Sequence, residues 1–279
     1  MTNEHNFLKV LKKYIESERF SLPIFDPVSL RIQQELIKKE PNLRTIEKLV
    51  SGDQSLSSNL IKVANSSMYR GLVPTTTVKS ALIRLGMSEV FRIVLAGVSQ
   101  RSFTAHDRQV DTIMKKLWQH SMGCAFAAGM LSNSLDFGVL QHEAFSAGLL
   151  HDVGKLLILK VIAEKKRKNR ALAVPDSLLL GAMDLLHAEQ GHLLLQQIQM
   201  PEIFAIVARD HHLPEFDPHN YILVLVRMAN HICHQMGIGL KHEPSLDLLA
   251  MAEAIQIRLS PSELEKVQDF LTTTSGLFA

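Results

Sequence analysis

Residues 148–155 read GLLHDVGK, a stretch that places His151 and Asp152 side by side within an otherwise apolar segment. Adjacent residues of a helix point about 100° apart, so both side chains can face one ligand only where the backbone permits it. Gly154, one turn on, would ease this constraint through its backbone freedom. The stretch therefore predicts that helices meet at a polar site.

Apolar residues recur at helical spacing outward from this stretch in both directions, whereas the Val/Ile alternation of strands is scarce. Two examples are the sets Leu56, Leu60, Val63, Ala64 and Met122, Phe126, Met130, Leu131. Breaks rich in Gly, Pro and Asp cut the chain into about a dozen helices of ordinary length. The predicted fold class is all-α, a multi-helical bundle.

The composition is that of an ordinary folded protein: 279 residues, 46% hydrophobic, 21% charged, with a formal net charge of +2. The near-neutral charge and the single Trp give no reason to expect a nucleic-acid partner. The start lacks a secretory signal, and no run reaches the roughly 18 apolar residues that span a bilayer. Cys124 and Cys233 are isolated, which indicates reduced thiols. We expect a cytoplasmic protein without a membrane partner.

The 13 histidines are distributed unevenly, since only His5 precedes residue 106. This asymmetry predicts an N-terminal helical subdomain over residues 1–105, which packs or recognises a partner. A second helical domain over residues 106–279 would carry the polar site.

Seven side chains of types that can bind a metal ion occur in or beside apolar helical segments of the second domain. They are His120, His151, Asp152, His187, His211, His212 and Asn230. Taken singly, a histidine such as His120 is more often a satisfied core residue than a ligand. Several imidazoles with one carboxylate suit a divalent transition metal such as Fe, Mn or Zn. Asp152 could bridge two such ions, and a bound water would then be aimed at a phosphoryl group or a similar electrophile.

Lys155 follows His151 by one helical turn. It is either a solvated lysine or a cation placed for a substrate phosphate. Asp152 and Lys155 are therefore the candidate catalytic residues if the protein is an enzyme.

This ordered set resembles the HD superfamily of metal-dependent phosphohydrolases, and further stretches are similar to the HDOD domain within it. Most telling are ANS at residues 64–66 and ALIRLG at residues 81–86. The resemblance covers roughly residues 20–240 and continues through these segments: LPIFDPVSLRIQQEL (22–36), LVSGDQSLSSNLIKVANSSMY (49–69), VKSALIRLGMSEVFRIVLAG (78–97), HAEQGHLLLQQIQMPEIFAIVARDHH (187–212) and LVRMANHICHQMGIG (225–239).

The resemblance implies an all-helical signalling module related to the HD-GYP cyclic-di-GMP phosphodiesterases. It assigns metal-binding roles to His120, His151, Asp152, His187, His211 and His212, and places Lys155 against a substrate phosphate. Two departures weigh against turnover: no GYP follows His212, and Asn230 stands where an HD phosphodiesterase carries Asp. Asn offers a carbonyl oxygen but no charge, so metal affinity and water activation should both fall.

Three functions follow as expectations. The first is an HDOD regulatory module with a partly retained metal site, which binds a signalling protein partner or a nucleotide-type ligand. The second is a metal-dependent phosphohydrolase or phosphodiesterase acting on a nucleotide or cyclic dinucleotide. The third is a metal- or redox-sensing switch between the two subdomains. The sequence leaves the metal, the ligand and the oligomeric state open.

Overall fold

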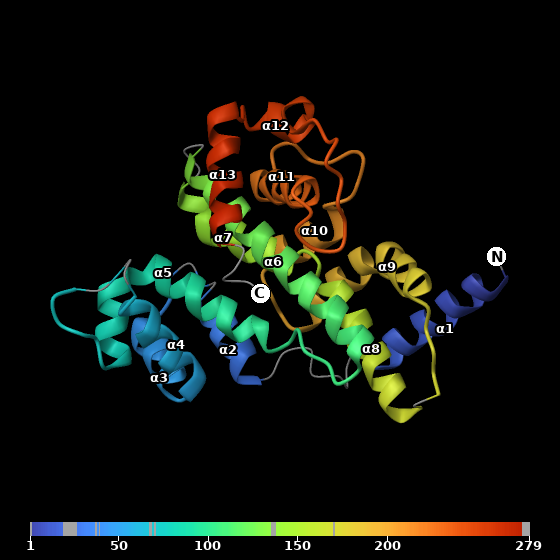
Figure 1. Ribbon diagram of the computed structural model, residues 1–279, viewed down its shortest axis with the longest axis horizontal. Helices are drawn as coiled ribbons and strands as arrows, with labels where there is room; N and C mark the ends of the chain where they lie inside the picture. The colour runs from blue at the N-terminus through green and yellow to red at the C-terminus, as the bar shows by residue number, and fades with distance from the viewer. Residues whose placement is uncertain are drawn as a thin grey trace. The chain divides into compact units, whose positions relative to one another are not determined.

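Figure 1 shows the computed structural model, in which residues 2–18, 27–36, 38, 40–66, 69, 71–134, 138–169 and 171–274 are described. All regular elements in these ranges are helices, so the prediction of an all-α fold is confirmed. No helix in them combines the length and the apolar character needed to cross a bilayer. Residues 22–26 of the HDOD-like stretch LPIFDPVSLRIQQEL lie outside the described ranges.

The chain forms two compact units, one of residues 25–102 and one of residues 1–24 with 103–279. The smaller unit contains α2 (Pro27–Leu36), α3 (Leu43–Ser51), α4 (Gln54–Ala64) and α5 (Val78–Gln100). Asn42 and Asp53 cap α3 and α4 by accepting hydrogen bonds from the backbone N–H of Thr45 and Leu56. Its core is made of fully buried side chains such as Ile32, Ile46, Val50 and Leu60.

The two telling stretches of this unit have structural roles. The Asn65 side chain donates to Thr75 O at 2.7 Å and accepts from Thr75 N at 2.8 Å, which closes the loop between α4 and α5. Arg84 donates to Val73 O in the same loop at 2.6 Å. Gly86 interrupts α5 with a φ of 74°, a torsion that favours glycine. The stretches thus fix a loop and a kink.

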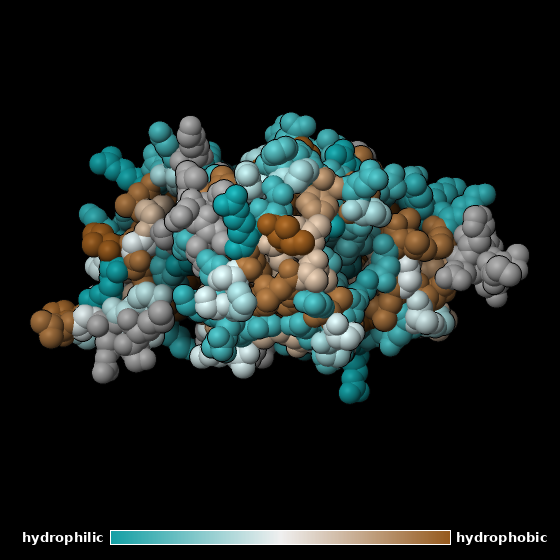
Figure 2. All heavy atoms as spheres, turned by 90° about the horizontal axis from the view of Figure 1, so that it is seen from above, coloured by the Kyte–Doolittle hydropathy of each residue, from teal (hydrophilic) through white to brown (hydrophobic). Residues whose placement is uncertain are grey.

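The larger unit contains the remaining helices. They are α1 (Thr2–Glu18), α6 (Arg108–Ser134), α7 (Gln141–Leu150), α8 (Val153–Lys168), α9 (Asp176–Gln197), α10 (Glu202–Asp210), α11 (Tyr221–Gln235), α12 (Ala252–Gln256) and α13 (Pro261–Thr274), with short 3-10 turns at Gly138–Leu140 and Leu248–Ala250. The long α6 packs against α7, α8, α11 and α13 and forms the centre of the unit. On the face drawn in Figure 2, hydrophilic residues are interspersed with small clusters of apolar residues.

The N-terminal helix belongs to a different unit from the one that the histidine distribution indicated. Leu11 and Ile15 of α1 are buried, and α1 packs against α8 and α9. Lys165 Nζ of α8 lies 4.0 Å from the centroid of the Tyr14 ring. The structure therefore divides the chain differently from the predicted 1–105 and 106–279. The amphipathic pattern of α1 predicts a buried face but not the helices that cover it.

Candidate metal centre

His151 and Asp152 form the turn between α7 and α8, and each is about 1% exposed. A Cβ atom on Gly154 would lie 1.9 Å from the carbonyl oxygen of His187. Any larger residue would therefore push the start of α8 away from α9. Gly154 acts through its missing side chain and not, as predicted, through backbone freedom, because its φ is not among the positive ones.

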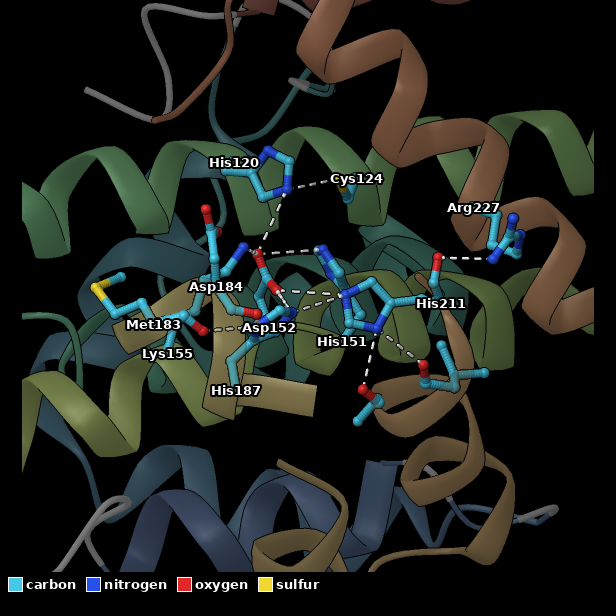
Figure 3. A network of polar contacts seen from close by, with 12 residues as sticks. His120, Cys124, His151, Asp152, Lys155, Met183, Asp184, His187, His211 and Arg227 are labelled. Carbon is cyan, nitrogen blue, oxygen red and sulfur yellow. Dashed lines mark hydrogen bonds and ion pairs between the residues drawn. The ribbon is translucent and has the colours of Figure 1, made fainter. Parts of the chain in front are cut away.

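Four imidazole rings direct their Nε2 atoms at the carboxylate of Asp152, as Figure 3 shows. His120 of α6 and His151 lie 3.6 Å and 3.5 Å from Asp152 Oδ2. His187 of α9 and His211, which follows α10, each lie 3.5 Å from Asp152 Oδ1. Each oxygen of one buried carboxylate thus faces two imidazoles.

The other ring nitrogen, Nδ1, of each histidine contacts a backbone carbonyl. The pairs are His120 with Ile238 O at 3.1 Å, His151 with Gly148 O at 2.7 Å, His187 with Met183 O at 2.7 Å and His211 with Ala208 O at 3.0 Å. Because a carbonyl oxygen only accepts, Nδ1 must carry the proton and donate it. The neutral rings therefore present bare Nε2 lone pairs to the centre, as metal-ligating histidines do.

Burial favours the neutral form of His120, His151 and His187, since it lowers the pKa of the first two and brings the pKa of His187 to about 4. For Asp152, burial acts to raise the pKa, but the charge of Lys155 holds it well below the usual range. His151 Nε2 and Asp152 Oδ1 are buried and have no hydrogen-bond partner. Such orphaned acceptors are costly unless a cation satisfies them.

The donors divide into two sets whose ligand atoms lie within 4.8 Å of one another. One set is His120, His151 and Asp152, and the other is Asp152, His187, His211 and His212. Imidazole and carboxylate are ligands of Fe, Mn and Zn, so the residues fit divalent ions of this kind. Asp152 belongs to both sets, which agrees with the hypothesis that it bridges two ions. The structure brings these six residues together, and their role as ligands stays a prediction.

Asn230 and Lys155 reach the centre differently. Asn230 of α11 is buried beside His120, and its side chain opposes the effect of burial on the His120 pKa. Lys155 is 5% exposed, and its Nζ donates to Asp152 Oδ2 at 2.7 Å. The alternative of a solvated Lys155 is therefore wrong.

A cavity of about 190 Å³ lies beside the centre. Its polar lining includes His120, Asp152, Lys155, His234 and Lys241. Apolar side chains such as Leu117 and Met183 complete the wall. A ligand in this cavity would meet the carboxylates of Asp152 and Asp184 and the two lysines that pair with them.

A family model for the HDOD domain matches residues 22–214 of the chain. The chain belongs to the HDOD domain family. The match includes every histidine of the two donor sets and ends before Asn230, so the departure at that position lies outside the matched part.

The HDOD chain is similar to several bacterial proteins. An uncharacterised protein of Treponema pallidum (strain Nichols) is 24% identical over 211 residues, 72% of this chain, and the match covers two fifths (40%) of that protein's length. A Shewanella amazonensis SB2B structure, provisionally named a metal-dependent phosphohydrolase, is 20% identical with a TM-score of 0.74 over 100% of both chains. A Marinobacter aquaeolei VT8 structure, provisionally named a signal transduction protein, is 20% identical with a TM-score of 0.69, covering 97% of this chain and 64% of that one. These two likenesses establish the fold.

Two cavity residues of the HDOD chain were not predicted. His234 is buried, and its ring stacks on His120 with centroids 5.3 Å apart. Its position four residues after Asn230 on one helix could have indicated this face. Lys241, whose Nζ lies 3.2 Å from Asp184 Oδ1, follows a loop and carries no periodic signal.

That loop holds His120 in place through two glycines. Gly237 and Gly239 have φ of 68° and 113°. A Cβ on Gly239 would lie 2.7 Å from the Cβ of His120. The loop therefore needs glycine to bring Ile238 O within reach of His120 Nδ1.

Arg227 supports the other side of the HDOD centre. Its Nη1 donates to the carbonyl oxygens of His211 at 2.9 Å and Leu213 at 2.8 Å, which closes the end of α10. Its Nε donates to Glu253 Oε1 at 2.7 Å, which balances the buried charge. In the sequence, Arg227 only interrupted an apolar run. In the structure, it fixes the turn that carries His211 and His212.

Proposed function

We propose that this HDOD chain is a signal-transducing regulatory module that binds a small phosphorylated ligand at a divalent-metal centre. One observation carries the proposal: four bare Nε2 atoms converge on the two oxygens of a single buried carboxylate, Asp152. The hydrogen bonds that fix the rings hold the donors in this orientation without a ligand. Such preorganisation lowers the cost of binding an ion.

The ligand class follows from charge and size. Lys155 and Lys241 line the same cavity as Asp152 and Asp184, and each lysine pairs with one of these carboxylates. Ions held by the donor sets would offset the Asp152 charge, so an anion there would meet these ions and the Lys155 cation. The cavity of about 190 Å³ is smaller than the ~300 Å³ at which pockets for drug-sized ligands begin. A phosphate with a small apolar remainder suits this space better than a cyclic dinucleotide does.

The second candidate is a metal-dependent phosphohydrolase, and the shared carboxylate favours it. Asp152 offers one oxygen to each donor set, as expected for a two-metal centre. Divalent ions at such a centre polarise phosphoryl oxygens and lower the pKa of water. Lys155 would stabilise the charge that develops on the phosphoryl group. Asn230 weighs toward binding, because it adds no charge beside His120.

The deciding experiment is metal analysis of the full chain purified without chelator or affinity nickel. We expect up to two transition-metal ions per chain in the wild type and none in the His151→Ala/Asp152→Ala variant. The matched control is His219→Ala/Asp217→Ala, which removes the same residue types from the loop before α11. A wild type without stoichiometric metal would overturn the proposal.

Calorimetric titration with inorganic phosphate and an assay with a chromogenic phosphodiester then separate the two candidates. Phosphate binding to the metal-loaded protein without hydrolysis supports the regulatory module. Hydrolysis that disappears in His151→Ala/Asp152→Ala supports the phosphohydrolase. Hydrolysis that survives in this variant indicates a contaminant and counts against the second candidate.

A further inference from the structure

A second group of metal-ligand types adjoins the centre. His120, Cys124 and Cys233 are 4%, 0% and 0% exposed, and their ligand atoms lie within 4.8 Å of one another. Both cysteines are free thiols, and they are the only two in the sequence. We call these three residues the thiol cluster. The proposed phosphate-binding function uses neither sulfur.

The helices position the cluster through ordinary packing. His120 and Cys124 are four residues apart on α6 and therefore share one face. Cys233 comes from α11, which packs against α6. A Cβ on Gly123 would lie 2.9 Å from Cys233 Sγ, so the missing side chain makes room for this sulfur against α6. The three donors come from two rigid helices.

The distances suit tetrahedral coordination. Bond lengths of about 2.3 Å for zinc to sulfur and 2.0 Å for zinc to nitrogen separate the two ligand atoms by about 3.5 Å. Cys124 Sγ lies 3.6 Å from His120 Nε2. His120 Nδ1 is engaged with Ile238 O, so Nε2 is the atom that offers a lone pair to the sulfurs.

We propose that the thiol cluster is a site for a thiophilic ion, Zn²⁺ foremost, distinct from the two donor sets around Asp152. Thiolate sulfur prefers such ions, whereas carboxylate oxygen prefers harder ones. Binding converts both thiols to thiolates, and their two protons leave to the solvent. The two thiolates balance the charge of the ion, so the occupied site carries no net charge into the interior.

The thiol cluster shares His120 with the set of His120, His151 and Asp152, so an ion in one group affects binding in the other. His120 Nε2 lies 3.6 Å from Asp152 Oδ2 as well as 3.6 Å from Cys124 Sγ, and one lone pair serves one ion at a time. An ion in the thiol cluster therefore removes a ligand from the set of His120, His151 and Asp152. This consequence alone rests on the proposed function, and the thiol site stands without it.

The test is a Co²⁺ titration of the reduced, chelator-treated full chain, followed by absorption. We expect an ultraviolet thiolate-to-cobalt band in the wild type, a weaker band in Cys124→Ala and in Cys233→Ala, and none in the double variant. Asp152→Ala should keep the band, which separates this site from the centre around Asp152. Ser146→Ala, which truncates another fully buried small side chain, is the matched control.

A wild type that binds cobalt without a thiolate band overturns the proposal, as does a band that persists in the double variant. A measurement without substitutions guards against variants that fail to fold. X-ray absorption at the zinc edge of wild-type protein with one equivalent of Zn²⁺ should show sulfur neighbours at about 2.3 Å. A shell of nitrogen and oxygen alone would place zinc elsewhere and sink the proposal.

Discussion

Lys155 Nζ donates to Asp152 Oδ2 at 2.7 Å, and both side chains are buried. The same oxygen faces His120 and His151, so the lysine cation occupies the neighbourhood where a metal ion would sit. Its charge holds the Asp152 pKa low and keeps the carboxylate ionised. Lysine and a metal ion would therefore compete electrostatically for one carboxylate, and a bound phosphate would relieve this competition by pairing with the lysine.

Lys155→Met tests this competition. Removing the cation should tighten Mn²⁺ binding about tenfold or more, because a like charge beside the ion is lost. The same substitution should weaken phosphate binding to the metal-loaded protein. Calorimetric titration measures both, and Lys160→Met on the same helix is the control, since Lys160 Nζ contacts Thr104 O instead. Weaker Mn²⁺ binding in Lys155→Met would contradict the competition.

Asn230→Asp introduces the carboxylate that the resemblance to HD phosphodiesterases implies at this position. The added charge beside His120 should raise the affinity for a divalent ion about tenfold, because an anion attracts the cation across a low-dielectric interior. Asn220→Asp is a matched control: it adds the same charge at the cap of the same helix and keeps the cap. Equal metal affinity in Asn230→Asp and the wild type would show that Asn230 does not act on the ion.

Arg227→Met should destabilise the larger unit by about 3–5 kcal/mol, because it leaves the buried Glu253 charge without its main partner and frees the carbonyls after α10. Urea denaturation measures the loss. Arg209→Met, which removes a half-exposed side chain from its pair with Asp210, should cost about 1 kcal/mol or less. Arg227→Met/Glu253→Gln should recover part of the loss, and no recovery would assign the effect to packing alone.

The smaller unit should lose stability in acid through Asp53. A side-chain hydrogen bond from Arg101 lowers the Asp53 pKa to about 2, against 3.8 for the ordinary group. The folded state thus binds this proton less readily, so the contribution is complete above about pH 4 and disappears as the pH falls toward 2.

Asp53→Asn keeps the cap on α4 and removes the charge. Hydrogen exchange of α4 and α5 should show a wild-type advantage at neutral pH that closes between pH 4 and 2. An advantage that persists or grows in acid would contradict the assigned role of Asp53.

Much of the fold could be predicted because helical periodicity is local. The spacing of Leu56, Leu60 and Ala64 gives α4 its buried face, and all three are buried. The unit to which α1 belongs could not be predicted from local periodicity. Leu11 and Ile15 mark an apolar face, but the choice of α8 and α9 to cover it depends on contacts some 150 residues along the chain.

The residues of the candidate site likewise fall into some that the sequence predicts and some that it does not. Ligand types and their order indicated His120, His151, Asp152, His187 and His211, and the structure brings these residues together. Cys124 and Cys233 carried no signal, because their meeting depends on how closely α11 approaches α6 at Gly123.

The sequence by itself determined the helices, the membership of the HDOD family and the residues that surround Asp152, because periodicity and motif order are properties of the chain. The tertiary structure alone decided that Lys155 points inward, that His234 and Lys241 line the cavity, and that His120 stands between the Asp152 carboxylate and the Cys124 thiol. These relations depend on distances between helices, which packing of complete surfaces sets and no short stretch of sequence encodes.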